Sequence, residues 1–170
     1  MPSVRNYLVL TSLVFVTTCV STPQEFSKIS QAQQKERVAE LINSGWSFKL
    51  GKSIKDIKQS LGKPLRENIE DYQNPHVENQ IDEIHILDYG GLMIHVYRAN
   101  EKPPRDILYR LIITDDDYEM KWGLGIGSTR KEVELLFGKS DRIEDENTNS
   151  VSFSFSNDKI DKIEWNWYLD

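Results

Sequence analysis

A fourteen-residue pattern that occurs twice constrains the fold of this 170-residue chain more than any other feature. The first copy covers residues 50–63 and the second covers residues 126–139, with one separation of 76 positions held throughout. Each copy contains Gly-x-Ser/Thr-x-x-Asp/Glu-Ile/Val and ends on Leu/Phe-Gly-Lys. A repeat of fixed period with matching chemistry is typical of one structural unit built twice. We therefore expect two copies of one small unit.

The local chemistry of each copy predicts a short helix. Ser53 and Thr129 are good N-caps, because a hydroxyl accepts a hydrogen bond from the first turn. An acidic residue three positions later completes a capping box in both copies. Gly62 and Gly138 follow where a left-handed C-cap is favoured. Helices of two to three turns are too short to be stable alone, so each must pack on another element.

Segments rich in β-branched and aromatic residues follow each helix and predict a small antiparallel sheet in each unit. Asn157 and Asp158 lie where a tight hairpin turn is expected. The expected strands cover 84–89, 92–98 and 107–114 in the first unit, and 142–144, 151–155 and 159–168 in the second.

The fold class predicted from these elements is α+β, a tandem repeat of helices followed by a small antiparallel sheet, with the helices packed on one sheet face. The two sheets either join edge to edge or stay separate. The expected segments are a signal peptide over 1–18, a tether over 19–29, an N-terminal helix over 30–45, a first repeat over 46–114, a linker over 115–121 and a second repeat over 122–170.

The N-terminus has the features of an export signal. Arg5 is the only charge in the first 24 residues, and the apolar run over residues 7–20 is shorter than the roughly 20 residues of a membrane-spanning helix. Cys19, the only cysteine, ends this run, and residues 16–19 resemble the lipobox of bacterial lipoproteins. The resemblance implies a lipid on Cys19 and a bacterial cell-envelope location, at the outer membrane or the periplasmic face. Cleavage after Ser21, which would give a soluble secreted or periplasmic protein, and an uncleaved apolar helix are the alternatives.

The charge balance argues against nucleic acid as a partner. The chain has 27 acidic and 21 basic residues, for a net charge of −6. A nucleic-acid interface needs a basic stripe that neutralises phosphates. With Cys19 at the signal boundary no disulfide is expected, so the fold must depend on packing alone.

Alternation along the strands assigns their faces. Leu92, Ile94 and Val96 alternate with Met93, His95 and Tyr97, and in the second unit apolar residues alternate with serine, glutamate and asparagine. One face of the sheet is therefore expected to be buried and the other to be open, polar and aromatic. The strand over 107–114 is ambiguous, because both of its faces are largely apolar. The candidate protein-binding residues are Tyr89, Met93, His95, Tyr97 and Tyr168.

Two copies of a helix plus sheet with this signature resemble the β-lactamase inhibitory protein fold, and the half-unit is similar to the SmpA/BamE-type outer-membrane-assembly lipoproteins. The similarity covers most of residues 48–170. It implies that the open sheet face and loops bind protein partners, and that a lipobox tethers the chain to the outer membrane. The inhibitor has disulfides, which this chain cannot form, and the assembly lipoproteins usually have one unit.

Reaction chemistry is not predicted. No serine lies in a Gly-x-Ser-x-Gly elbow, and the cysteine is used at the signal boundary. We therefore expect a non-catalytic protein-binding module without a cofactor or metal, which acts as an assembly factor or an inhibitor. The alternative is a small-ligand or metal binder, or an enzyme, that uses His85 and His95 as cross-strand partners with Asp88 nearby.

Overall fold

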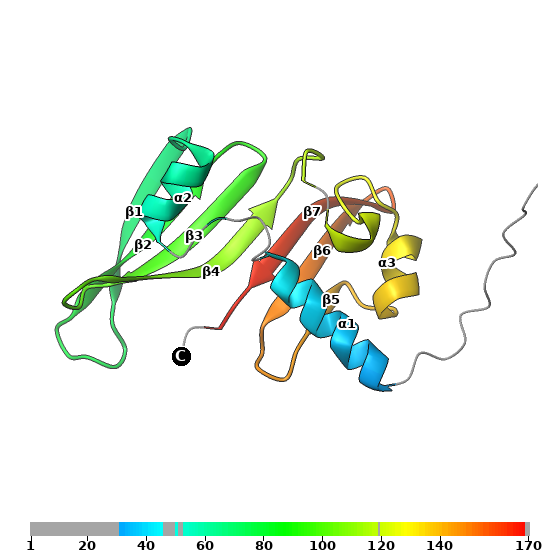
Figure 1. Cartoon of the computed structure of the whole chain (residues 1–170), viewed down its shortest axis with the longest axis horizontal. Coiled ribbons are helices and arrows are strands. Elements are labelled where there is room, and N and C mark those ends of the chain that lie inside the picture. The colour runs from blue at the N-terminus through cyan, green and yellow to red at the C-terminus, as the bar shows by residue number, and fades with distance from the viewer. Residues whose placement is uncertain (1–30, 46–49, 51–52, 119, 169–170) are drawn as a thin grey trace, which may run out of the picture.

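The computed structural model describes residues 31–45, 50, 53–118 and 120–168, and Cys19, the predicted signal peptide and the predicted tether lie outside these ranges. The described chain is α+β, with three α-helices and one seven-stranded antiparallel sheet (Figure 1). Within it, no helix combines the length and the apolar character needed to cross a membrane. The helices are α1 (Gln31–Ser44), α2 (Ile54–Leu61) and α3 (Arg130–Phe137), with a short 3-10 turn η2 (Lys121–Gly123). The strands are β1 (Arg66–Gln73), β2 (Ile81–Asp88), β3 (Leu92–Ala99), β4 (Arg105–Ile113), β5 (Arg142–Glu144), β6 (Ser150–Ser156) and β7 (Lys159–Asn166).

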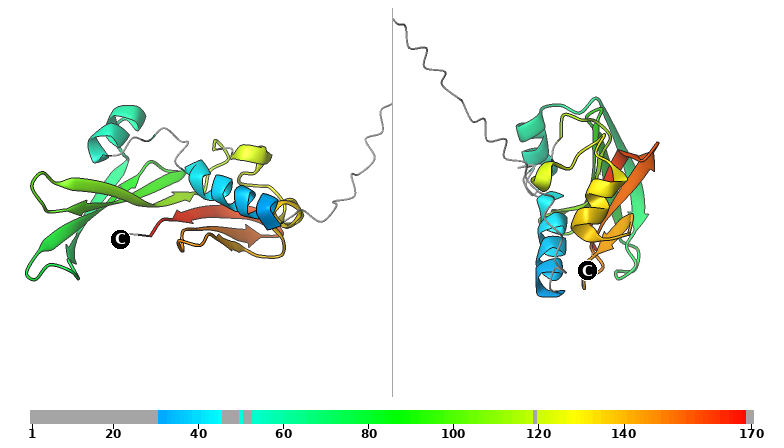
Figure 2. Two further views of the ribbon diagram at one scale, coloured as in Figure 1. Left: turned by 60° about the horizontal axis from the view of Figure 1, so that its bottom comes forward. Right: turned by 90° about the vertical axis from the view of Figure 1, so that its right-hand side faces the viewer.

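The two groups of strands join edge to edge in one sheet. The strand order is β1-β2-β3-β4-β7-β6-β5. Strands β4 and β7, which end the groups β1–β4 and β5–β7, are therefore neighbours. They pair antiparallel, with Leu111 opposite Trp165 and Ile113 opposite Ile163. Figure 2 shows that the sheet is strongly twisted, with β1 and β2 turned relative to β5 and β6. Of the two arrangements left open by the sequence, the edge-to-edge sheet is the one formed.

Helices α2 and α3 begin directly after the predicted caps. The Thr129 hydroxyl and the Glu132 carboxylate form the complete capping box. In the first copy, Ser53 Oγ accepts from Asp56 N at 3.1 Å and donates to the Asp56 carboxylate at 2.8 Å. The backbone N–H of Ile54 donates to Asp106 Oδ2 of β4 at 2.9 Å, which fixes the start of α2 against the sheet.

The glycines that end these helices have a different geometry from the predicted left-handed cap. Gly62 has φ 82° and ψ −163°, and Gly138 has φ 86° and ψ −178°. This extended region at positive φ is essentially restricted to glycine. The position of each glycine was predicted correctly, and its conformation was not.

One apolar cluster unites the helices with the sheet. Leu92, Ile94 and Val96 of β3 are fully buried, as the alternation predicts. They share the cluster with apolar residues of α1, α2, α3 and β7. Helix α1 is the first described element, yet it contacts α3, β5 and β6, which come much later in the chain (Figure 1). Its Leu41 carbonyl accepts a hydrogen bond from Trp165 Nε1 at 3.2 Å.

Strand β1 is the element that the sequence does not predict. All eight of its residues are exposed, so it has neither an apolar face nor an alternating pattern. It pairs with β2 along its whole length and forms one edge of the sheet. The six predicted strands all form, and the turn at Asn157 (φ 51°) and Asp158 (φ 60°) has the positive φ angles of a tight hairpin.

Candidate functional site

The candidate site is the sheet face that carries Met93, His95 and Tyr97, which we call the His95 face. These residues alternate along β3 with Leu92, Ile94 and Val96, so they point to the side of the sheet opposite the apolar cluster. Met93 and Tyr97 are half-buried, whereas His95 is 8 % exposed. The structure therefore brings three of the five predicted contact residues onto one face.

Directly paired residues of neighbouring antiparallel strands share a face, so the register extends the His95 face across the sheet. His95 lies between Ile86 of β2 and Arg110 of β4, and Met93 lies opposite Ile112. The half-buried members added by the register are Ile84, Ile86, Ile107, Arg110, Ile112, Glu164 and Asn166.

A β-bulge adds an aromatic ring to this face. The register of β3 with β4 shifts between His95 and Val96, which pair with Arg110 and Leu108, so Tyr109 is the extra residue. The Tyr109 ring meets the His95 imidazole edge to face, with centroids 5.9 Å apart and planes at 79°. Because the bulge breaks the two-residue period of β4, alternation alone did not reveal that Tyr109 and Arg110 belong to this face.

An ion-pair group occupies the centre of the sheet beside His95. Arg110 Nη2 lies 2.9 Å from Glu164 Oε1, and Lys162 Nζ lies 3.2 Å from Glu164 Oε2. Asn166 Nδ2 donates to Glu164 at 3.1 Å. Burial alone would raise the pKa of Glu164, but the hydrogen bonds from Asn166, Arg110 and Lys162 and the charge of Arg110 outweigh it and lower the pKa. Glu164 is therefore an ordered anion held by three neighbours.

His95 is a neutral residue at neutral pH. Burial and the positive charge of Arg110 lower the pKa of His95 to about 4. The negative charge of Glu164 raises this pKa and offsets part of their effect. Its Nε2 is buried and finds no hydrogen-bond partner among the described residues. With a neutral imidazole packed against Tyr109, the centre of the face presents aromatic rings and the Arg110–Glu164 pair.

Tyr97 is held by a buried carboxylate that sequence reasoning missed. Its hydroxyl donates to Asp82 Oδ2. Its ring meets the Tyr72 ring edge to face, with the ring centroids 5.8 Å apart. Asp82 is 0 % exposed and also accepts from Asn74 Nδ2 at 2.7 Å, Gln80 Nε2 at 2.7 Å and Asn100 N at 2.8 Å. Burial, followed by the hydrogen bond to Asp82 and the negative charge of that carboxylate, raises the pKa of Tyr97 to about 12. The ring of Tyr97 is therefore fixed in place at the edge of the face.

The other two predicted contact residues, Tyr89 and Tyr168, lie just beyond the ends of β2 and β7. Tyr89 packs beside the end of α2, where its hydroxyl donates to the Gly62 carbonyl at 3.2 Å, so its role is to attach a helix. Tyr168 follows β7 and is 67 % exposed, and its backbone N–H donates to Asn149 Oδ1 at 2.9 Å. Although β7 itself ends at Asn166, the alternation of burial continues through buried Trp167 to exposed Tyr168.

The pairing of His85 with His95 was predicted wrongly. The register places His85 opposite Val96 and His95 opposite Ile86, so the two imidazoles lie on opposite faces of the sheet. His85 is buried on the core face, with Nε2 2.8 Å from Glu83 Oε2 and Nδ1 3.4 Å from Glu67 Oε1. A site that needs both histidines is therefore incompatible with this fold.

Among the described residues, one acidic cluster has carboxylates close enough to share a metal ion. The ligand atoms of Asp115, Asp116 and Asp117 lie within 4.8 Å of one another in the segment after β4. Asp115 Oδ1 accepts from Asp117 N at 2.9 Å, which is the bonding of an ordinary aspartate turn.

Taken together, the site is a broad surface of half-buried aliphatic and aromatic side chains around one charged group. Such a surface suits contact with another protein, because aromatic residues, methionine and arginine are enriched at the centres of interfaces. Comparison of the chain with protein-family models, with curated proteins and with solved structures finds no match.

Proposed function

We propose that this chain is an exported, lipid-anchored cell-envelope protein that acts as a non-catalytic protein-binding module and holds its partner on the His95 face. The observation that carries the proposal is the composition of that face. Met93, Tyr97, Tyr109 and Arg110 are residue types that dominate interface energetics, and they lie together at one surface. Their exposed fraction is intermediate, so a partner would bury further apolar area.

The proposal includes a tandem repeat of one helix-plus-sheet unit. Helices α2 and α3 begin and end 76 positions apart, and three strands follow in each half, β2–β4 and β5–β7. The last strands of the halves pair antiparallel at the centre, as a two-fold relation between the units requires. In this scheme β1 is an addition to the first unit. Figure 2, in which the helices lie to one side of the sheet, supports a covered face and an open one.

The resemblance to β-lactamase inhibitory protein and to SmpA/BamE-type lipoproteins bears on how the face is used. In that group the open sheet face and loops bind protein partners. The proposed role is accordingly that of an inhibitor or an assembly factor, with the partner held against the strands. The lipid on Cys19 would keep the module at the membrane, and cleavage without lipid would make it a diffusible periplasmic protein.

Photo-crosslinking tests the binding face. Benzoylphenylalanine is placed at Met93 or at Ile112 on the His95 face and, as a control, at Leu135, which is 42 % exposed on α3. The first two positions are expected to give the same discrete adduct in the intact envelope, and the Leu135 position is expected to give none. The adduct should fade when Tyr109→Ala is combined with either label. Equal labelling from all three positions, or no adduct from Met93 and Ile112, rejects the His95 face as the binding surface.

The anchor is tested separately by the intact mass of the membrane-extracted protein beside Cys19→Ala. A chain that begins at Cys19 and carries the mass of diacylglycerol supports the proposal. A lipid-free chain that begins near Thr22 rejects the anchor and leaves the binding face to its own test.

A further inference from the structure

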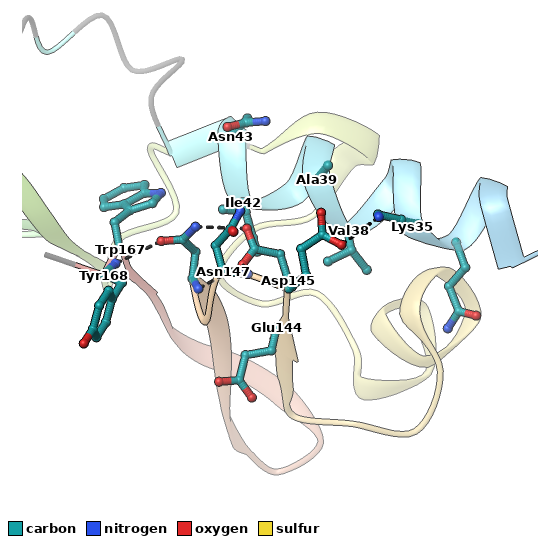
Figure 3. Close-up of a pocket in the computed structure, with 13 residues that line it drawn as sticks. Lys35, Val38, Ala39, Ile42, Asn43, Glu144, Asp145, Asn147, Trp167 and Tyr168 are labelled. Atoms are coloured by element: carbon teal, nitrogen blue, oxygen red, sulfur yellow. Dashed lines mark hydrogen bonds and ion pairs between the residues drawn. The ribbon is translucent and has the colours of Figure 1, made fainter. Parts of the chain in front are cut away.

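A second surface, distinct from the His95 face, is a groove of about 800 Å³ between α1 and the loop that joins β5 to β6 (Figure 3). Helix α1 forms one wall from Gln34 to Asn43, and the loop from Glu144 to Asn149 forms the other. Trp167 and Tyr168 close one end. This size is typical of ligand sites, which usually occupy 300–1,000 Å³.

The floor of the groove is apolar. Val38 and Ile42 lie one helical turn apart on α1, and Trp167 lies beside them. Ile42 is 3 % exposed and Trp167 is 8 % exposed, so both are firmly packed, whereas Tyr168 is 67 % exposed at the rim. The wall on α1 spans nine residue steps, or about 13 Å, which matches roughly four residues of extended peptide. The groove therefore has the shape for a short extended segment with an apolar side chain on the floor.

The loop wall carries the charge. Among the described residues that line the groove, Glu144, Asp145 and Glu146 stand against one basic residue, Lys35, so their net charge is −2. Asp145 is committed to its own loop, since it accepts from Asn147 N at 2.8 Å and from Asn149 N at 3.0 Å. The charge of the groove thus favours a cationic side chain on the occupant.

One solvent-exposed ion pair spans the groove, so a charged group of a partner can replace one of its two members. Lys35 Nζ lies 2.8 Å from Glu146 Oε2, and these side chains are 71 % and 69 % exposed. Exposed pairs of this kind contribute little to stability. An arginine from a partner can therefore replace Lys35 on Glu146, and its planar guanidinium binds a carboxylate in a bidentate way that lysine cannot.

We propose that this groove binds an extended peptide segment of a partner that carries an arginine flanked by apolar residues. The arginine takes the place of Lys35 on Glu146, and an apolar neighbour contacts Val38 and Trp167. The proposal stands apart from the His95 face, because the two surfaces share none of the residues that carry them.

The test uses the full chain and blocked pentapeptides with arginine at the centre and leucine or phenylalanine on each side, with glutamate-centred peptides for comparison. Binding is measured by fluorescence anisotropy of labelled peptides. The arginine peptides are expected to bind and the glutamate peptides to bind more weakly. Glu146→Gln should weaken binding about two- to fivefold, and Lys35→Met should strengthen it by a similar factor, as expected for removing an exposed charge interaction.

Matched variants control for general charge and for helix stability. Glu78→Gln removes an exposed carboxylate outside the groove and should leave binding unchanged. Ala39→Arg places a cation on the groove wall and should weaken binding more than tenfold, whereas Ala32→Arg, on the same helix but outside the lining, should not.

Three results overturn the proposal. The first is the absence of arginine-peptide binding up to millimolar concentration, and the second is equal binding of the glutamate peptides. The third is a nuclear Overhauser contact, in the unliganded full chain, from Trp167 to the chain's own terminal residues, which would make those residues the occupant. Opposite responses to Lys35→Met and Glu146→Gln are the signature that a merely structural role of the groove would not produce.

Discussion

Replacement of Asp82 by asparagine is expected to destabilise the fold in a pH-dependent way. Asp82 is 0 % exposed, and burial alone would raise its pKa, but hydrogen bonds from Tyr97, Asn100, Gln80 and Asn74 outweigh burial and lower the pKa from 3.8 to about 2. At 1.36 kcal/mol per pKa unit, the ionised carboxylate stabilises the fold by about 2 kcal/mol at neutral pH. Because the folded pKa is depressed, this stabilisation is complete above the unfolded pKa and is lost as the pH falls through the folded value. About half of it remains at pH 3.

Urea unfolding, followed by tryptophan fluorescence, measures this effect in the wild type and in Asp82→Asn. At pH 7 the free energy of unfolding should differ between the two proteins by about 2 kcal/mol or more, and at pH 3 this difference should narrow by about 1 kcal/mol. Asp71→Asn, which changes an exposed carboxylate of β1, should cost less than about 0.5 kcal/mol at either pH. A difference for Asp82→Asn that is the same at pH 7 and pH 3 would refute the assigned role of the hydrogen bonds.

The other predictions concern the two ends of the helices and the core, and each is measured as a change in the free energy of unfolding in urea at pH 7. Thr129→Ala removes the hydroxyl that caps α3 and should cost about 0.5–2 kcal/mol, with Thr129→Ser restoring most of the loss; a cost for serine equal to that for alanine would contradict the capping role. Gly62→Ala and Gly138→Ala should each cost about 1–3 kcal/mol from backbone strain, since an added Cβ meets nothing within 4 Å at either site; a neutral effect at both would show that the positive φ is not required. Leu111→Ala empties a fully buried position of β4 and should cost about 2–5 kcal/mol, whereas Leu135→Ala, at a 42 % exposed position, should cost far less, and similar costs for the two leucines would disprove the assigned core.

The sequence predicts best where local chemistry decides the structure. Ser53 and Thr129 set the starts of α2 and α3, because capping needs only residues within one turn. Alternation assigns Leu92, Ile94 and Val96 to the core, because a strand with one buried face cannot change register without exposing all of them.

The sequence predicts poorly where residues that are distant along the chain determine the local structure. Strand β1 has no buried face, and its pairing with β2 is visible only once β2 is placed. The bulge at Tyr109 moves an aromatic ring onto the His95 face and cannot be read from a strand whose two faces are both apolar. Asp82 reads as an ordinary acid in the chain, and only the fold brings Tyr97 and Asn100 to it.

The position of α1 has a consequence for how the chain acquires its structure. α1 lies at the start of the described chain, yet its contacts are with α3, β5 and β6, and its Leu41 carbonyl is bonded to Trp165, 124 residues later. During synthesis, α1 emerges long before its packing surface exists. Contacts of such long sequence separation slow folding, because a large loop must close first. The apolar side of α1 therefore stays exposed until the final strand has been synthesised and has paired with the sheet.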